Sequence, residues 1–93
     1  MEKVKQAEIV FKKIVELIFP PEAQHFNISS KVDEGGIFLL IHPKTREAAG
    51  LLVGKKGRNV YFLKKAMRKW AIFNKCYVSL KIELPFENNV KSP

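Results

Sequence analysis

A Gly-Lys-Lys-Gly turn separates two helical patterns within residues 50–63, GLLVGKKGRNVYFL. Ahead of the turn, Thr45 can cap a helix, and Glu47 places a negative charge in its first turn, where it favours the helix dipole. Beyond the turn, apolar residues recur at helical spacing, which predicts an amphipathic helix beginning near Arg58. The inward face of that helix would consist of Val60, Leu63, Met67, Trp70 and Ala71. The region therefore predicts two helices joined by a tight turn in which glycine accommodates positive φ.

Three strands are expected around this helical pair. Residues 25–32 alternate apolar with polar side chains, which predicts a half-exposed strand. A polar turn with two glycines, at residues 33–36, leads into the unbroken apolar run 37–41, which is typical of a buried central strand. Alternation returns over residues 77–84, and Pro85 ends that last strand.

An amphipathic helix is predicted at residues 2–19, before Pro20 and Pro21 stop it. Its core-facing residues would be Val4, Ala7, Val10, Phe11, Ile14, Leu17 and Ile18. The element order is then helix, strand, strand, helix, helix, strand. A two-helix crossover between the last two strands makes them parallel. We therefore expect an α+β two-layer sandwich, with a three-stranded mixed sheet and three helices on one face.

Length and composition predict one globular domain. The chain has 93 residues, of which 46% are hydrophobic and 28% charged. The predicted elements assign residues 1–85 to that domain and residues 86–93 to a tail. The N-terminus lacks a signal-peptide pattern, and no apolar run approaches 18 residues, so we expect no membrane association and a cytoplasmic location.

Catalytic and metal chemistry find little support in the residues. Cys76 is the only cysteine, which excludes an internal disulfide framework and a cysteine-based zinc site. His25 and His42 border predicted strands, and neither has a carboxylate or cysteine at ligand spacing. We expect no catalytic residues, no metal site and no cofactor, and hence no enzyme.

Positive charge is concentrated in one window. The formal net charge is +8, and residues 55–75 hold eight basic residues and no acidic one. These are Lys55, Lys56, Arg58, Lys64, Lys65, Arg68, Lys69 and Lys75. Such a field attracts a polyanion. A solvated helix face that keeps a small protein soluble is the alternative interpretation.

The turn at Gly54–Gly57 has the features of a phosphate site. Glycine allows another backbone to approach closely, and the free N–H groups of the following helix point toward the turn. Lys55, Lys56 and Arg58 add positive charge there. A plain helix–helix turn that merely needs glycine is the other interpretation.

Residues 50–63 resemble the signature of the K-homology (KH) domain. That family has a Gly-x-x-Gly loop between two helices, an aliphatic residue just before it, and aliphatics three and six residues after it. Here those aliphatics are Val53, Val60 and Leu63. The predicted element order resembles the type II arrangement over residues 4–84, most like small bacterial single-KH proteins and the KH module of the Jag family.

The resemblance implies single-stranded RNA binding without catalysis. Carried over residue by residue, the loop that clamps the sugar-phosphate chain would be Gly54, Lys55, Lys56 and Gly57. Leu51, Val53 and Val60 would floor the adjoining groove. Asn59 could donate to a phosphate or base, or be an exposed polar residue at a helix start.

Two features depart from the family pattern. Tyr61 and Phe62 are adjacent, and only one of them is expected to face inward. An exposed Tyr61 could stack on a base or lie on neighbouring lysine stems. The second feature is the breadth of the basic helix, since its further cations lie beyond a four-nucleotide clamp. Lys64, Lys65, Arg68 and Lys69 suggest a longer or structured RNA, such as ribosomal or small RNA, or serve solubility alone.

Two other functions compete with RNA binding. A P-loop nucleotide site is disfavoured because one residue is missing between Gly50 and Gly54 and no Ser or Thr follows the lysine.

A protein-interaction module is the serious alternative. If Ile37, Leu39 and Ile41 face the helices, the alternation along strand 37–41 leaves two large side chains on the outer face of the sheet. Phe38 and Leu40 would then contact a second copy, another protein, or the tail through Phe86.

Overall fold

The element order of the chain matches the predicted one. The computed structural model describes residues 2–19 and 25–83. In chain order, the elements are α1 (Lys3–Ile18), β1 (Phe26–Asp33), β2 (Gly36–Pro43), α2 (Arg46–Val53), the short 3-10 turn η2 (Lys55–Gly57), α3 (Arg58–Phe73) and β3 (Val78–Ile82). The predicted strand end at residue 84 and the tail at 86–93 lie outside the described residues.

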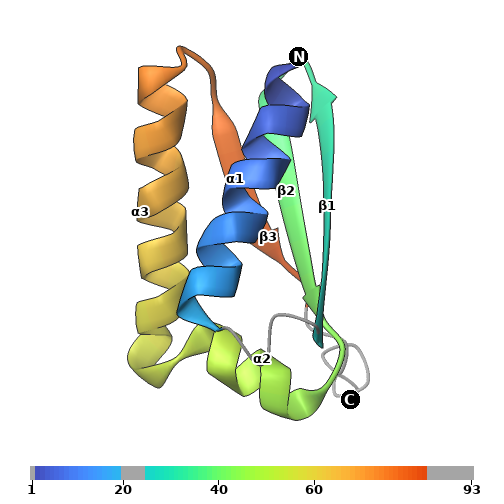
Figure 1. Cartoon of the computed structure of the whole chain (residues 1–93), viewed down its shortest axis with the longest axis vertical. Coiled ribbons are helices and arrows are strands. Elements are labelled where there is room, and N and C mark those ends of the chain that lie inside the picture. Colours follow the sequence, from blue (N-terminus) through green and yellow to red (C-terminus); the bar gives the residue numbers. More distant parts are fainter. Residues whose placement is uncertain (1, 20–24, 84–93) are drawn as a thin grey trace, which may run out of the picture.

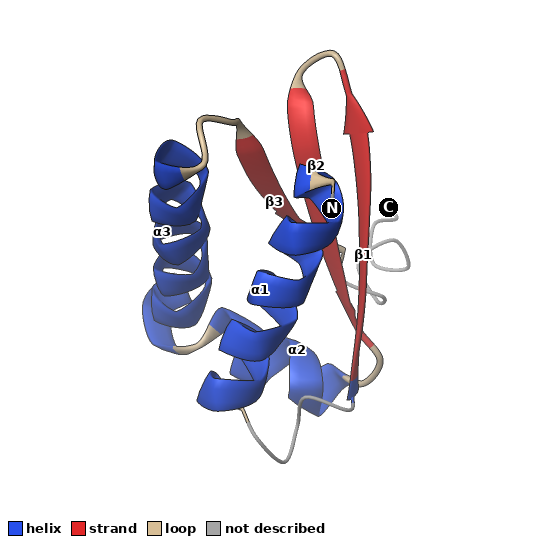
Figure 2. Cartoon of the chain, turned by 45° about the horizontal axis from the view of Figure 1, so that its top comes forward, coloured by secondary structure: helices blue, strands red, loops and turns tan. Residues whose placement is uncertain are grey.

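The three strands form one mixed sheet in the order β1-β2-β3. β1 and β2 are antiparallel, with Phe26 opposite Pro43 and Asp33 opposite Gly36. β2 and β3 are parallel, with Ile37 opposite Val78. In Figures 1 and 2, α1 and α3 cover one face of the sheet, while α2 lies across the end where β2 finishes. The predicted α+β sandwich with helices on one face is therefore confirmed.

Alternation along β2 determines which face meets the helices. Ile37, Leu39 and Ile41 are buried, whereas Phe38 and Leu40 are half-buried on the opposite face. The core also includes Phe11 of α1, Leu52 of α2, and Leu63 and Met67 of α3. Thr45 caps α2 as predicted, because its Oγ1 accepts a hydrogen bond from the Ala48 N–H at 3.0 Å.

One predicted core residue of α1 is wrong. Leu17 is 80% exposed, and Val15, which was not among the predicted residues, is buried instead. Ala7, Phe11 and Val15 follow one another at intervals of four, so they share a face. Leu17 lies two residues beyond Val15, about 200° around the helix, and therefore points away from the sheet.

A close backbone approach joins the β1–β2 turn to the start of β3. Gly36 has φ +121°, and a Cβ built there would lie 2.7 Å from the Tyr77 carbonyl oxygen. That same oxygen accepts a hydrogen bond from the Ile37 N–H at 2.8 Å. Only glycine allows the turn to meet β3 at this distance, and the contact holds the Tyr77 backbone against the sheet.

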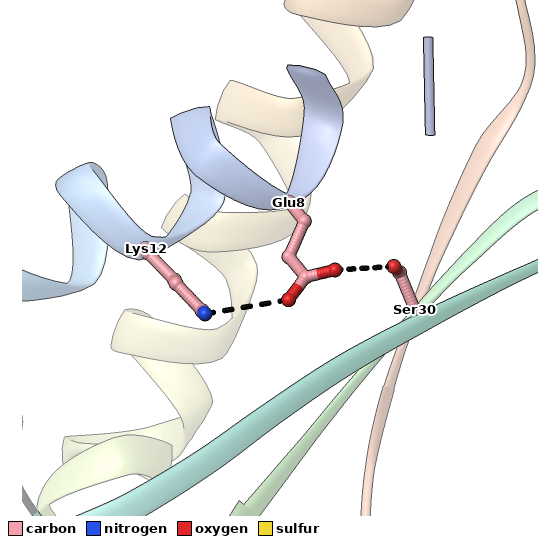
Figure 3. A network of polar contacts seen from close by, with 3 residues as sticks. All are labelled: Glu8, Lys12 and Ser30. Carbon is pink, nitrogen blue, oxygen red and sulfur yellow. Dashed lines mark hydrogen bonds and ion pairs between the residues drawn. The ribbon is translucent and has the colours of Figure 1, made fainter. Parts of the chain in front are cut away.

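A polar contact ties α1 to β1 (Figure 3). The Ser30 hydroxyl donates to Glu8 Oε1 at 2.5 Å, and Lys12 Nζ lies 3.3 Å from Glu8 Oε2. The hydrogen bond from Ser30 is the main reason why the pKa of Glu8 is lowered from its ordinary value of 4.5, and Lys12 adds to the shift. The ionised carboxylate therefore stabilises the docking of α1.

Replacing Glu8 with Gln should destabilise the fold in a pH-dependent manner. Because the pKa of Glu8 is lower in the folded state, its contribution is complete above pH 4.5 and is lost as the pH falls through the folded value. We expect the Glu8→Gln variant to lose about 1 kcal/mol near pH 7, and this difference to shrink by pH 3. Urea unfolding at both pH values measures it. Glu16→Gln, at an exposed position of the same helix, is the control. A Glu8→Gln deficit that is the same at both pH values would contradict the assignment.

Candidate nucleic-acid interface

Left-handed backbone makes the turn between α2 and α3. Gly54 has φ +75° and ψ 176°, Lys56 has φ +56°, and Gly57 has φ +73°. The Gly57 N–H donates to the Gly54 carbonyl at 3.2 Å, which closes the turn. Three of its four residues thus adopt conformations that favour glycine, and one of those three is a lysine.

The Asn59 side chain holds the turn through a hydrogen bond to α2. Its Nδ2 donates to the Leu51 carbonyl at 2.8 Å, so it satisfies a carbonyl in the last turn of α2 from the first turn of α3. A Cβ on Gly54 would lie 2.7 Å from that same Nδ2. The Asn59 amide group therefore donates one hydrogen bond to the protein's own backbone, and donation of its second N–H to a ligand stays a prediction.

The cations of the turn face solvent. Lys55, Lys56 and Arg58 are all exposed. Among the described residues, Lys55 and Lys56 have no ion pair or side-chain hydrogen bond, and no acidic residue stands between positions 48 and 82. Their charge is therefore available to an anion at the N-terminus of α3, a 16-residue helix.

Apolar side chains flank the turn on both helices. Leu51 is 42% exposed, and Val53 and Val60 are half-buried. The three residues predicted to floor a groove are thus close in sequence to the turn and partly accessible, whereas Leu52 and Leu63 supply the core.

A hollow of about 570 Å³ lies between α3 and the edge strand β3. Its walls combine two cations of α3 with apolar residues and the edge of β3. The lining residues are Lys64, Met67, Arg68, Ala71, Ile72, Cys76, Tyr77, Val78, Ser79 and Leu80. Figure 1 shows β3 running beside α3 along this side of the molecule. Lys64 and Arg68 belong to the predicted basic window 55–75, whereas the β3 residues are not predictable, because the strand pattern does not tell which strand is at the edge.

Both aromatic residues at the start of α3 are exposed. Tyr61 is 64% and Phe62 is 53% exposed, which corrects the prediction that one of them faces inward. Leu63 already fills the core position at this turn of the helix. Lys65 Nζ lies 5.5 Å from the centroid of the Tyr61 ring, so this tyrosine packs against a neighbouring lysine.

The outer sheet face carries the two predicted apolar residues. Phe38 stands opposite Lys31 of β1, and Leu40 opposite Lys81 of β3. Both are half-buried and belong to a shallow hollow that also includes Asp33 and Glu83. Charged side chains therefore surround this small apolar surface.

The described part of the chain contains neither a candidate metal site nor a candidate membrane-spanning helix. Residues 2–19 and 25–83 contain no group of three or more His, Cys, Asp or Glu side chains placed to hold a metal ion. Within the same residues, no helix combines the length and apolar character needed to cross a bilayer.

Comparison with solved structures gives a fold match. A crystal structure of an Era variant from Aquifex aeolicus, bound to GDP.AlF4-, superposes with a TM-score of 0.65 at 13% sequence identity. The match covers 90% of this chain and 31% of the Era chain, so this chain spans about a third of that protein. At this identity the likeness shows the fold alone. No family model and no curated protein matches the sequence.

Proposed function

We propose that this chain binds single-stranded RNA, without catalysis, through the Gly54–Gly57 turn and the adjoining basic side of α3. The observation that carries the proposal is the position of Lys55 and Lys56 in a glycine-flanked turn at the N-terminus of α3. Both lysines are exposed, and neither forms an ion pair with a described residue. Backbone N–H groups and cations at that point provide the donors and charge that a phosphodiester needs.

The hollow beside α3 supports the choice of a single strand. Lys64 and Arg68 line it together with Met67, Ala71 and Leu80, so charge and apolar surface lie side by side. Unpaired bases need apolar or stacking surface while their phosphates need cations. A duplex, whose bases are stacked inside, would not use such a hollow.

The KH resemblance agrees with this assignment. The α-β-β-α-α-β order and the mixed sheet are compatible with the type II arrangement, and the Gly-x-x-Gly turn connects α2 with α3 as in that family. We extend the proposal to a cytoplasmic protein whose ligand is a longer RNA, of ribosomal or small-RNA type, because basic residues continue along α3.

A KH-fold interaction module remains the alternative function. Phe38 and Leu40 on the outer sheet face would contact a second copy or another protein, and the hollow around them favours this site. An apolar interface of this kind depends weakly on salt, whereas phosphate binding depends on it strongly.

The salt dependence of RNA affinity tests the proposed function. Neutralising three to five phosphates should make log affinity fall with log salt at a slope of about −2 to −4. Fluorescence anisotropy of a labelled eight-nucleotide RNA, titrated at several potassium chloride concentrations, measures the slope. A slope near zero, or no binding at low salt, would contradict the proposal.

A further inference from the structure

The turn between α3 and β3 holds its backbone in a defined position. Asn74 Nδ2 donates to the Trp70 carbonyl at 2.9 Å, and the Cys76 N–H donates to the Ala71 carbonyl at 3.0 Å. Lys75 between them takes a left-handed φ of +54°. The Tyr77 carbonyl accepts a hydrogen bond from the Ile37 N–H of β2. Hydrogen bonds to α3 before Tyr77 and to β2 at Tyr77 thus fix the backbone at this residue.

The Tyr77 side chain is nevertheless left in solvent. Tyr77 is 80% exposed and Ile72 is 70% exposed, and both line the hollow between α3 and β3. Among the described residues, the Tyr77 ring and hydroxyl have no hydrogen bond or ring contact. A large ring on a fixed backbone presents contact area that costs little conformational entropy to order.

The charges around this ring select the kind of ligand. Lys64 and Arg68 line the same hollow, and Lys75 lies two residues before Tyr77. The residues that line the hollow include Lys64 and Arg68 and no acidic side chain, so the charge of the hollow favours an anionic partner. Exposed aromatic rings among cations are the features with which proteins hold unpaired bases and their phosphates.

We propose that Tyr77 is a stacking platform for an unpaired base, so that the bound RNA strand runs along α3 from the Gly54–Gly57 turn to the start of β3. This inference rests on the proposed function and extends its site. The 16 residues of α3 span about 24 Å. If the bound strand keeps the 3.4 Å per nucleotide that one strand has in a double helix, that length corresponds to about seven nucleotides. The preferred ligand is therefore longer than the four nucleotides that the turn alone would hold.

Oligoadenylates of four and eight nucleotides distinguish the two parts of the site. The Tyr77→Ala variant should bind the eight-nucleotide strand about tenfold more weakly, because base stacking on an aromatic ring contributes about 1–3 kcal/mol. Its affinity for the four-nucleotide strand, which the turn holds, should not change. Tyr77→Phe keeps the ring and should restore binding. Anisotropy titrations at fixed salt measure each affinity.

Phe73→Ala is the matched control. Phe73 is 86% exposed at the same end of α3 but does not line the hollow, so its removal should leave both affinities unchanged. Circular dichroism should show native folding for all three variants, since each removes an exposed group.

The outcomes separate the inference from the proposed function. If the wild-type protein binds RNA and Tyr77→Ala binds both strands normally, the stacking platform is wrong and the turn site stands. The same holds if light scattering shows that Tyr77→Ala loses self-association while its RNA affinity is unchanged, because the face would then be a protein contact. If the wild-type protein binds neither strand, the proposed function itself fails.

Discussion

Replacing Lys55 and Lys56 together with aspartate should abolish binding of single-stranded RNA. The exchange turns two positive charges into two negative ones at the point where we place the phosphates. We expect a loss of affinity of about 100-fold or more at low salt, and a salt slope reduced by about two. Anisotropy titration of the eight-nucleotide strand against salt measures both quantities.

The fold should survive this exchange for reasons visible at the turn. Lys56 has a left-handed φ of +56°, a conformation that aspartate tolerates better than most residues. Both positions are exposed, and negative charge at the N-terminus of α3 is favourable to the helix dipole. The thermal midpoint of the variant should therefore equal or exceed that of the wild type.

A control variant separates the local effect from the change in net charge. Lys13→Glu together with Lys31→Glu makes the same change in charge at exposed positions of α1 and β1. We expect that variant to keep most of its affinity. If the aspartate variant is native by circular dichroism and also binds RNA as the wild type does, the Gly54–Gly57 turn is not the site.

The fold was predictable because local signals and periodicity agree in this chain. The run Ile37–Ile41 between glycine and His-Pro favours a short buried strand over a helix, and Thr45 marks the start of α2. The crossover through two helices then required β3 to be parallel to β2. The turn residues and the clustered cations could be proposed as a site because they are contiguous in sequence.

The remaining features depend on contacts that no local pattern reveals. Val15 replaces Leu17 in the core because the rotation of α1 about its axis is set by what it packs against, and residues 14, 15, 17 and 18 are all apolar. The hydrogen bond of Asn59 to Leu51 and the hollow beside β3 both need two elements in place. The exposure of Tyr77 beside that hollow likewise follows only from the folded chain.

Replacing Gly54 with alanine should be far more damaging than changing Gly57. Gly54 combines φ +75° with ψ 176°, a region that essentially only glycine occupies, whereas Gly57 with ψ 17° is in the ordinary left-handed region that asparagine tolerates. A Cβ on Gly54 would also lie 2.7 Å from Asn59 Nδ2, while nothing lies within 4 Å of one on Gly57. We expect Gly54→Ala to cost about 3 kcal/mol and Gly57→Asn less than about 1 kcal/mol, measured by urea unfolding.

The cost at Gly54 has two parts that a double-mutant cycle can separate. Asn59→Ala alone removes the hydrogen bond to Leu51 and should cost about 1 kcal/mol. It also removes the two atoms nearest to the new methyl group, at 2.7 and 2.8 Å, so Gly54→Ala should cost less in that background. The strain of the backbone conformation would remain. Strictly additive costs would mean that the clash does not contribute.

The Gly54→Ala exchange should also weaken RNA binding. If the turn clamps phosphate through its backbone, Gly54→Ala must weaken RNA binding even where the protein is fully folded, because the N–H groups of the turn are displaced while Lys55 and Lys56 are retained. We expect about tenfold weaker binding, equivalent to about 1.4 kcal/mol, and a salt slope unchanged from the wild type. The same loss with a reduced slope would instead indicate that the lysines had moved out of reach of the phosphates. An unchanged affinity in the folded variant would mean that charge alone holds the strand and that the shape of the turn has no part in binding.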